Sequence, residues 1–178
     1  MDLLDRLLGH DRWTTAQLLE RCRELRAEQW IEPFDLGHQT LAATFQHMIG
    51  NVRVWADLMA ERAVQHSADE AVSAADDLIA QWQTAYESFA TLARTISDQG
   101  RWDASYLDVL DAPPRPKTFG GTIAHVITHN MHHRAEVIHI LTRLGLKNVL
   151  EGDVLSWEQQ LQSTRPFTQA ATSSTETI

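Results

Sequence analysis

Apolar residues recur at steps of three and four through most of this 178-residue chain, which is the spacing of one face of an α-helix. The pattern predicts helices over residues 3–28, 40–65, 70–98 and 121–144 and a short one at 153–162. Thr40 is the expected N-cap of the second helix, and Gly145 is expected to end the fourth. Pro33 and Gly37 mark a loop between the first two helices.

The segment 99–118 does not follow this spacing. Its three prolines exclude a long helix, whereas Trp102 and Tyr106 are too apolar for a free linker. We therefore expect a connection that packs against the helices, and no alternation long enough for a sheet. The predicted fold is all-α, a four-helix bundle with a long connection between the third and fourth helices.

Composition and charge narrow the possible functions. Residues 1–162 are the predicted domain, and residues 163–178, with few large apolar side chains, are a predicted mobile tail. The net charge of −9 argues against binding to nucleic acid or to an anionic membrane surface. No apolar run exceeds three residues, so we expect neither a membrane-spanning helix nor a signal peptide. Cys22 is the only cysteine, which excludes an internal disulfide and fits a cytoplasmic protein; its inward position predicts a core filler.

Five of the nine histidines lie between residues 125 and 139. On a helical wheel His129 and His133 point toward the buried side, and His125 lies at its edge. His132 and His139 point away and should be solvated. Neighbours at i and i+4 are roughly 5–6 Å apart at Cβ, so His129 and His133 can converge on one metal ion. Glu136 lies beside the His129 edge, where it could orient a ligand.

A third ligand is needed because two imidazoles hold a divalent ion weakly. His47, on the second predicted helix, can face the bundle interior, and Asn51 lies one turn farther on the same side. The alternative is that these histidines are hydrogen-bonded packing residues and that no metal binds.

Three segments carry a resemblance to a known family. They are DRWTTAQLLE at 11–20, GHQTLAATFQHMIGNVRVW at 37–55, and HVITHNMHHRAEVIHILTRLG at 125–145. In their order and separation they resemble the DinB-like (DinB/YfiT) metalloenzymes, over about residues 3–150. The resemblance implies a four-helix bundle with a long connection before its fourth helix. It also implies a divalent metal, usually zinc or nickel, held by three histidines that match His47, His129 and His133.

The resemblance further implies a homodimer and, where relatives have known activities, a transferase or isomerase that uses bacillithiol, mycothiol or glutathione. The family name refers to damage-inducible expression and does not imply DNA binding. We expect a metal-dependent thiol S-transferase acting on a small molecule, in which a thiolate or a water molecule on the metal is the catalytic group. Arg134 is a candidate to contact a carboxylate of the thiol.

Two other functions remain open at this point. A metal-dependent hydrolase would use the same site to activate water. A non-catalytic, metal-binding stress-response protein would have a closed site with a fourth protein ligand, for which His125 and Glu136 are candidates.

Overall fold

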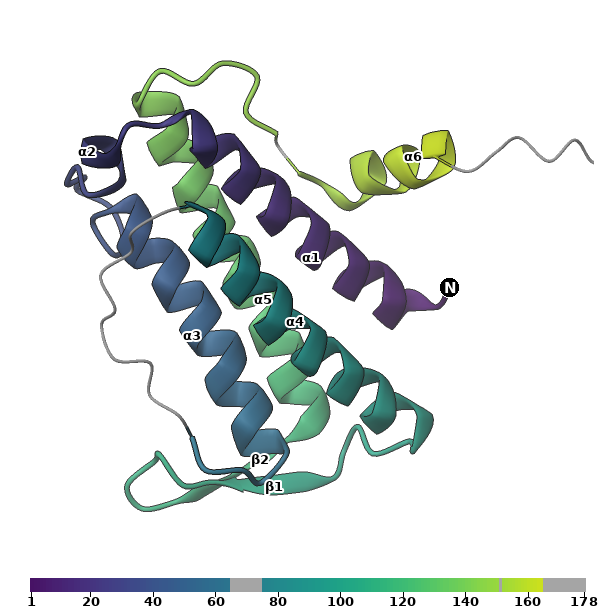
Figure 1. Ribbon diagram of the computed structural model, residues 1–178. Coiled ribbons are helices and arrows are strands. Elements are labelled where there is room, and N and C mark those ends of the chain that lie inside the picture. The colour runs from purple at the N-terminus through teal and green to yellow at the C-terminus, as the bar shows by residue number, and fades with distance from the viewer. Residues whose placement is uncertain (65–74, 151, 165–178) are drawn as a thin grey trace, which may run out of the picture.

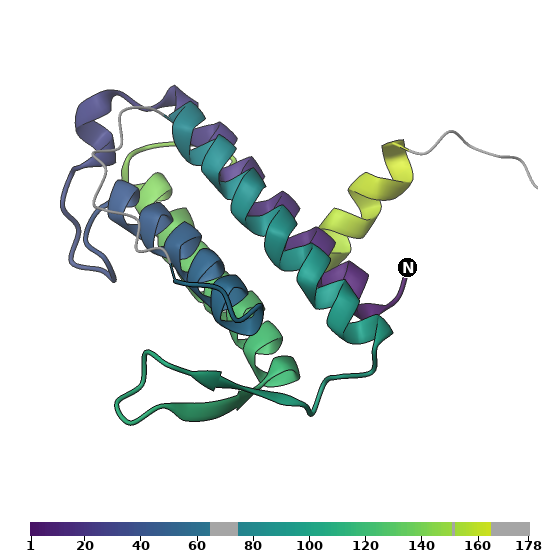
Figure 2. The ribbon, with the colours of Figure 1, turned by 60° about the horizontal axis from the view of Figure 1, so that its bottom comes forward.

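A computed structural model describes residues 1–64, 75–150 and 152–164 of the chain. Four long helices of this part pack as a bundle: α1 (Leu3–Arg21), α3 (Leu41–Met59), α4 (Ala75–Asp98) and α5 (Phe119–Arg143) (Figure 1). Figure 2 shows α1 beside α4 in one layer and α3 beside α5 in the other. The predicted all-α bundle is therefore confirmed, and none of the helices in the described ranges is long and apolar enough to cross a membrane.

The apolar stripes of the four helices meet in one core. Phe45 of α3, Trp82 and Phe89 of α4 and Val137 of α5 are all fully buried. Burial of a side chain of this size contributes roughly 1.5–3 kcal/mol to folding. The core thus fixes the rotation of α3 and α5 about their own axes, which decides which of their polar residues face each other.

The first predicted helix, 3–28, is broken in the structure. α1 ends at Arg21, a 3₁₀ turn spans Cys22–Glu24, and a short helix α2 covers Ala27–Trp30. Leu25 and Arg26, which connect the 3₁₀ turn to α2, take extended backbone angles. The Gln29 side chain accepts a hydrogen bond from the Arg26 amide (3.0 Å), so a new helix start competes with continuation of the first helix.

The second predicted helix ends earlier than expected. α3 begins after Thr40, whose hydroxyl accepts from the Ala43 amide at 3.1 Å, as predicted for an N-cap. Its last residue is Met59, because Glu61 takes a left-handed conformation (φ 52°) that closes the helix end. The predicted end of this helix and the predicted start of the next, at residue 70, lie outside the described residues, and the described part of α4 starts at Ala75.

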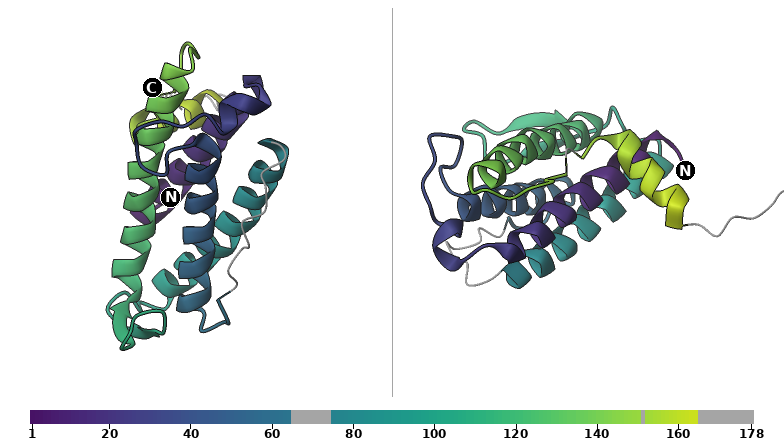
Figure 3. Two further views of the ribbon diagram at one scale, coloured as in Figure 1. Left: turned by 90° about the vertical axis from the view of Figure 1, so that its left-hand side faces the viewer. Right: turned by 90° about the horizontal axis from the view of Figure 1, so that it is seen from above.

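The connection between α4 and α5 contains a small sheet, so the prediction of no sheet is wrong. β1 (Ser105–Asp108) pairs antiparallel with β2 (Arg115–Thr118), with Ser105 opposite Thr118. In β1 the polar Asp108 is buried with Tyr106, whereas the apolar Leu107 is exposed. The strand therefore lacks the alternation of apolar and polar residues by which a strand is predicted from sequence. The hairpin lies at one end of α3 and α5 (Figure 3), and its Tyr106 hydroxyl is 2.8 Å from the Thr122 hydroxyl of α5.

α5 starts after Thr118, which caps Gly121, and Gly145 follows its end with φ 91°, as predicted. The last described helix, α6 (Val154–Thr164), lies across α1 (Figure 3), where Trp157 is buried. The predicted mobile tail, 163–178, lies outside the described residues apart from its first two positions, which end α6.

Candidate metal centre

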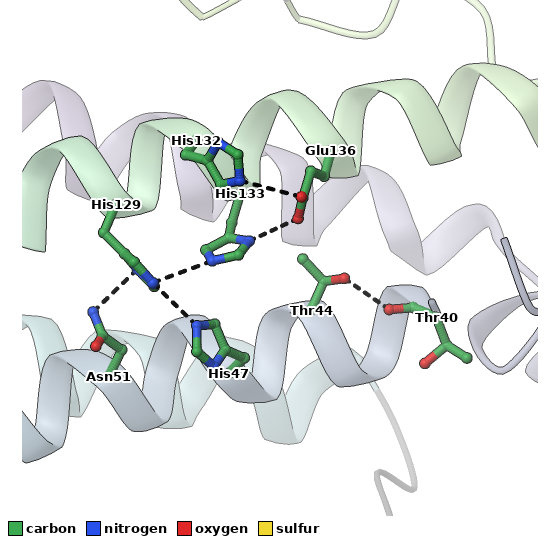
Figure 4. A network of polar contacts seen from close by, with 8 residues as sticks. All are labelled: Thr40, Thr44, His47, Asn51, His129, His132, His133 and Glu136. Atoms are coloured by element: carbon green, nitrogen blue, oxygen red, sulfur yellow. Dashed lines mark hydrogen bonds and ion pairs between the residues drawn. The ribbon is translucent and has the colours of Figure 1, made fainter. Parts of the chain in front are cut away.

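A row of polar side chains fills the contact between α3 and α5. His47 and Asn51 are one turn apart on α3, and His129, His133 and Glu136 are spaced by single turns on α5. Figure 4 shows these side chains pointing toward one another from the two helices. His133 is buried and His129 is half-buried, so both take the orientation that the helical wheel predicts.

Three imidazole nitrogens of this row lie close together. His129 Nε2 is 3.1 Å from His47 Nε2 and 3.2 Å from His133 Nε2 (Figure 4). With zinc–nitrogen bonds of about 2.0–2.1 Å, tetrahedral geometry separates two ligand nitrogens by about 3.3–3.4 Å. The two separations from His129 Nε2 differ from this by only a few tenths of an ångström, so the pairs His47–His129 and His129–His133 each fit a divalent transition metal.

Glu136 orients His133. Glu136 Oε2 accepts a hydrogen bond from His133 Nδ1 at 2.7 Å, which leaves the lone pair of Nε2 directed toward His129. Its second oxygen, Oε1, is 3.3 Å from His132 Nε2 on the exposed side. The helical wheel predicts that Glu136 lies beside the His129 edge, and in the structure its carboxylate instead contacts His133.

A second hydrogen-bonded chain holds His129. Trp55 Nε1 donates to Asn51 Oδ1 at 2.8 Å, and the Asn51 amide nitrogen lies 3.1 Å from His129 Nδ1. Because the carbonyl end of the amide is used by Trp55, its NH₂ end faces the imidazole as a donor. Asn51 therefore contacts a candidate ligand, on the side of the helix that the wheel predicts.

His47 and His129 are neutral near pH 7. Burial, and then the neighbouring imidazoles, lower the pKa of both His47 and His129 to about 4. A neutral imidazole has a free lone pair, which is the form that binds a metal. The electrostatics of the cluster therefore favour coordination over protonation.

Sequence reasoning missed His38, which precedes α3. His38, His47 and His133 each offer a ligand atom within 4.8 Å of the others, and the His38 and His47 rings stack with centroids 3.9 Å apart. A second group of this kind consists of His132, His133 and Glu136. Helical spacing cannot reveal a loop residue, and the only available signal was a histidine two residues ahead of the Thr40 cap.

The other predicted site residues form no hydrogen bond or ion pair with the Nε2 atoms of His47, His129 and His133 in the part of the chain that the structure describes. His125 is exposed, with its ring against Trp55 (centroids 5.4 Å apart), and His132 and His139 are exposed as predicted. Arg134 is only 3% exposed and forms an ion pair with the fully buried Asp11 of α1. A contact between Arg134 and a thiol carboxylate therefore has no support from its position.

Cys22 is buried in the core, and burial raises the pKa of its thiol. This agrees with its predicted role as a filler and excludes it as the nucleophile of this site. Any thiol chemistry at the imidazole cluster must use a thiol from outside the chain.

The segments that carried the sequence resemblance supply α1, the α3 histidine and the α5 histidines of this structure. No curated protein matches the chain. The family model of the DinB family matches residues 1–173, which include all of the described bundle and its imidazole cluster, and the chain therefore belongs to the DinB family.

Proposed function

We propose that His47, His129 and His133 hold a divalent metal ion, zinc or nickel, and that the protein is a metal-dependent thiol S-transferase. The observation that supports this most is the approach of the three Nε2 atoms, at 3.1 and 3.2 Å, from two different helices. Through His129 Nε2, ring nitrogens of α3 and α5 come within the distance at which imidazoles bind one ion.

The chain's own residues prepare the site for this role. His47 and His129 are kept neutral by burial, and Glu136 fixes the His133 ring by accepting its Nδ1 proton. The bundle core prevents the two helices from rotating apart. When bound, a divalent ion supplies a charge that favours the ionised form of a nearby thiol.

The thiol in this proposal is bacillithiol, mycothiol or glutathione, since the only cysteine of the chain is buried. In the reaction the thiol sulfur forms a bond to an electrophilic carbon of a small molecule. The leaving group departs with its bonding electrons, and the thiol proton goes to solvent. The proposal also includes a cytoplasmic, damage-inducible homodimer, which rests on the family resemblance and on the composition.

The first test is metal content. Untagged protein is loaded with Zn²⁺ or Ni²⁺, and the metal-to-protein ratio is measured by mass spectrometry after desalting. His129→Ala and His133→Ala should each lower metal affinity by at least about tenfold, whereas His139→Ala, at an exposed position of the same helix, should not. No retained metal in the unmodified protein would overturn the metal site itself.

The second test is conjugation. The loaded protein is mixed with 1-chloro-2,4-dinitrobenzene and each of the three thiols in turn, and release of chloride is compared with that of the His129→Ala variant. A rate that depends on one thiol and on His129 supports the transferase. Equal rates in the two proteins would overturn it.

A non-catalytic metal-binding protein is the second candidate function. The observation that favours it is the fourth imidazole, His38, beside His47 and His133, because metal sites closed by four protein ligands are typically structural. Tight metal binding without conjugation of any of the three thiols would select this alternative.

A further inference from the structure

His38 differs from the other imidazoles of the cluster in the element that carries it. His47, His129 and His133 lie within the long helices α3 and α5, whose backbones are held by regular hydrogen bonds. His38 lies in the loop between α2 and α3, yet its ring stacks on His47 and lies 5.2 Å from the His133 ring, measured between centroids.

The loop is folded tightly around His38. Gly37 and Gln39, on either side of it, both take positive φ values (45° and 68°). The Phe34 amide donates to the Gln39 carbonyl at 2.7 Å, and the Thr40 amide donates to the His38 carbonyl at 2.8 Å. A left-handed conformation is costly for a residue with a side chain, so the strain at Gln39 is held by the contacts around the loop, and loss of those contacts would favour release of the loop.

The same loop touches the carboxylate that orients His133. A methyl group at Gly37 would lie 2.5 Å from Glu136 Oε2, so the glycine backbone sits directly against this side chain. Movement of the loop would therefore move His38 away from His47 and also uncover Glu136. The loop position and the state of the site are coupled through these contacts.

We propose that His38 is an exchangeable fourth ligand of the metal, which binds when no thiol is present and gives up its position to the sulfur of an incoming thiol. This inference rests on the three-histidine site of the proposed function. In the exchange the thiol S–H bond breaks and its proton goes to the buffer. His38 leaves as a neutral imidazole, and no group is oxidised or reduced.

The test uses full-length protein loaded with Co²⁺, whose visible spectrum reports ligand type and number. The variants are His38→Ala and His38→Gln, and His139→Ala is the matched control, since it removes an exposed imidazole far from the loop in sequence. Both His38 variants should bind Co²⁺ about tenfold more weakly than the unmodified protein and show a shifted spectrum, whereas the control should not change.

Free imidazole separates a ligand role from a structural one. Added at millimolar concentration, it should restore the unmodified spectrum in His38→Ala by occupying the position that the side chain has left. A spectrum of His38→Ala that changes but does not respond to imidazole would overturn the ligand role. Circular dichroism of each variant verifies that the bundle is folded, and His38→Gln keeps a polar side chain in the loop if alanine unfolds it.

The exchange itself is tested with 2-mercaptoethanol as the probe thiol, followed by the sulfur-to-cobalt charge-transfer band in the near ultraviolet. In the unmodified protein the thiol must displace His38, so half-saturation should need about tenfold more thiol than in His38→Ala. Equal half-saturation in the two proteins, or a thiol that never binds to the unmodified protein, would overturn the exchange.

The outcomes distinguish this inference from the proposed function. If Co²⁺ binding depends on His129 and His133 and is the same with and without His38, only the role of His38 fails. If the unmodified protein retains no Co²⁺, the three-histidine site fails and the exchange fails with it.

Discussion

At the scale of single residues, the Asn51 amide decides which nitrogen of His129 carries the proton. Trp55 donates to Asn51 Oδ1, so the amide NH₂ faces His129 Nδ1 as a donor. A neutral His129 then carries its proton on Nε2, the nitrogen that approaches His47 and His133. In the proposed site, metal binding through Nε2 would require this proton to leave, so Asn51 would weaken His129 as a ligand.

We predict that Asn51→Asp raises the metal affinity by about tenfold. A carboxylate at this position would accept from both Trp55 Nε1 and His129 Nδ1–H, and would thereby direct the lone pair of Nε2 at the metal. The affinity is measured by competition with a chelating dye at pH 7. Asn51→Leu, which has a similar size and no polar atoms, is the control and should not raise the affinity. If the Asn51→Asp variant binds metal no better than the unmodified protein, the argument is contradicted.

The sequence predicts some residues of the site and misses others for identifiable reasons. Helical periodicity is enough to turn His129 and His133 toward α3, because the apolar core fixes the rotation of α5. His38 has no periodic neighbours, so nothing in the sequence links it to a helix that begins only at Phe119. The partner of Glu136 depends on side-chain rotamers, which a wheel angle does not give.

At the scale of elements, a buried ion pair joins α1 to α5. Arg134 pairs with Asp11, and Asn130 Nδ2 donates to the same carboxylate at 2.8 Å. The Tyr86 hydroxyl of α4 is buried beside them, and burial, followed by the Asp11 charge, raises its pKa. This polar cluster fixes the register of α1 against α5. Arg134, its α5 cation, directly follows His133 in the chain.

We predict that Arg134→Met destabilises the protein by about 3–5 kcal/mol, because it leaves the Asp11 carboxylate buried without a partner. Asp11→Asn combined with Arg134→Met should recover most of the loss, since no net charge is then buried and Asn130 keeps an acceptor. Urea unfolding followed by circular dichroism gives the free energies. A double variant as unstable as the single one would show that the charge is not the cause.

The docking of α6 on α1 depends on Gly9. A methyl group there would overlap the Trp157 ring, which is buried against this position. We predict that Gly9→Ala displaces α6, costs about 1–3 kcal/mol and shifts tryptophan fluorescence to the red. Gln17→Ala, at an exposed position of α1, is the control. Unchanged fluorescence and stability in Gly9→Ala would mean that α6 adapts without leaving.

Element positions were easier to predict than their ends. The long apolar stripes located all four bundle helices, because a stripe of this length has few other ways to be buried. The break after Arg21 depends on an extended Leu25, an apolar residue that continues the stripe in sequence. The hairpin buries an aspartate, Asp108, which caps a turn by accepting from the Leu110 amide, so its strand has no apolar alternation to detect.

At the scale of the whole molecule, the imidazole cluster makes the stability of the metal-free protein depend on pH. Folding lowers the pKa of His47 and His129 from the ordinary value of 6.5 to about 4. Between these values the unfolded chain binds protons that the folded chain does not. The free energy of unfolding should therefore fall as the pH drops from 6.5 toward 4.

Urea midpoints of chelator-treated protein across this interval check the prediction. A variant with His47→Asn and His129→Asn should show a shallower decrease, because it lacks both shifted groups, and the difference between the two proteins isolates their contribution from that of the carboxylates. Identical slopes would contradict the assignment of the effect to these imidazoles.

His47 and His129 are 82 positions apart, and α4 and the hairpin lie in the chain between them. An ion bound to both would act as a removable cross-link across this long stretch. Closing a loop of that size in the unfolded state removes conformational entropy worth about 4–5 kcal/mol at 25 °C. The thermal stability of the bundle would then increase with the concentration of free metal ion. At low metal concentration more of the protein would unfold and be degraded.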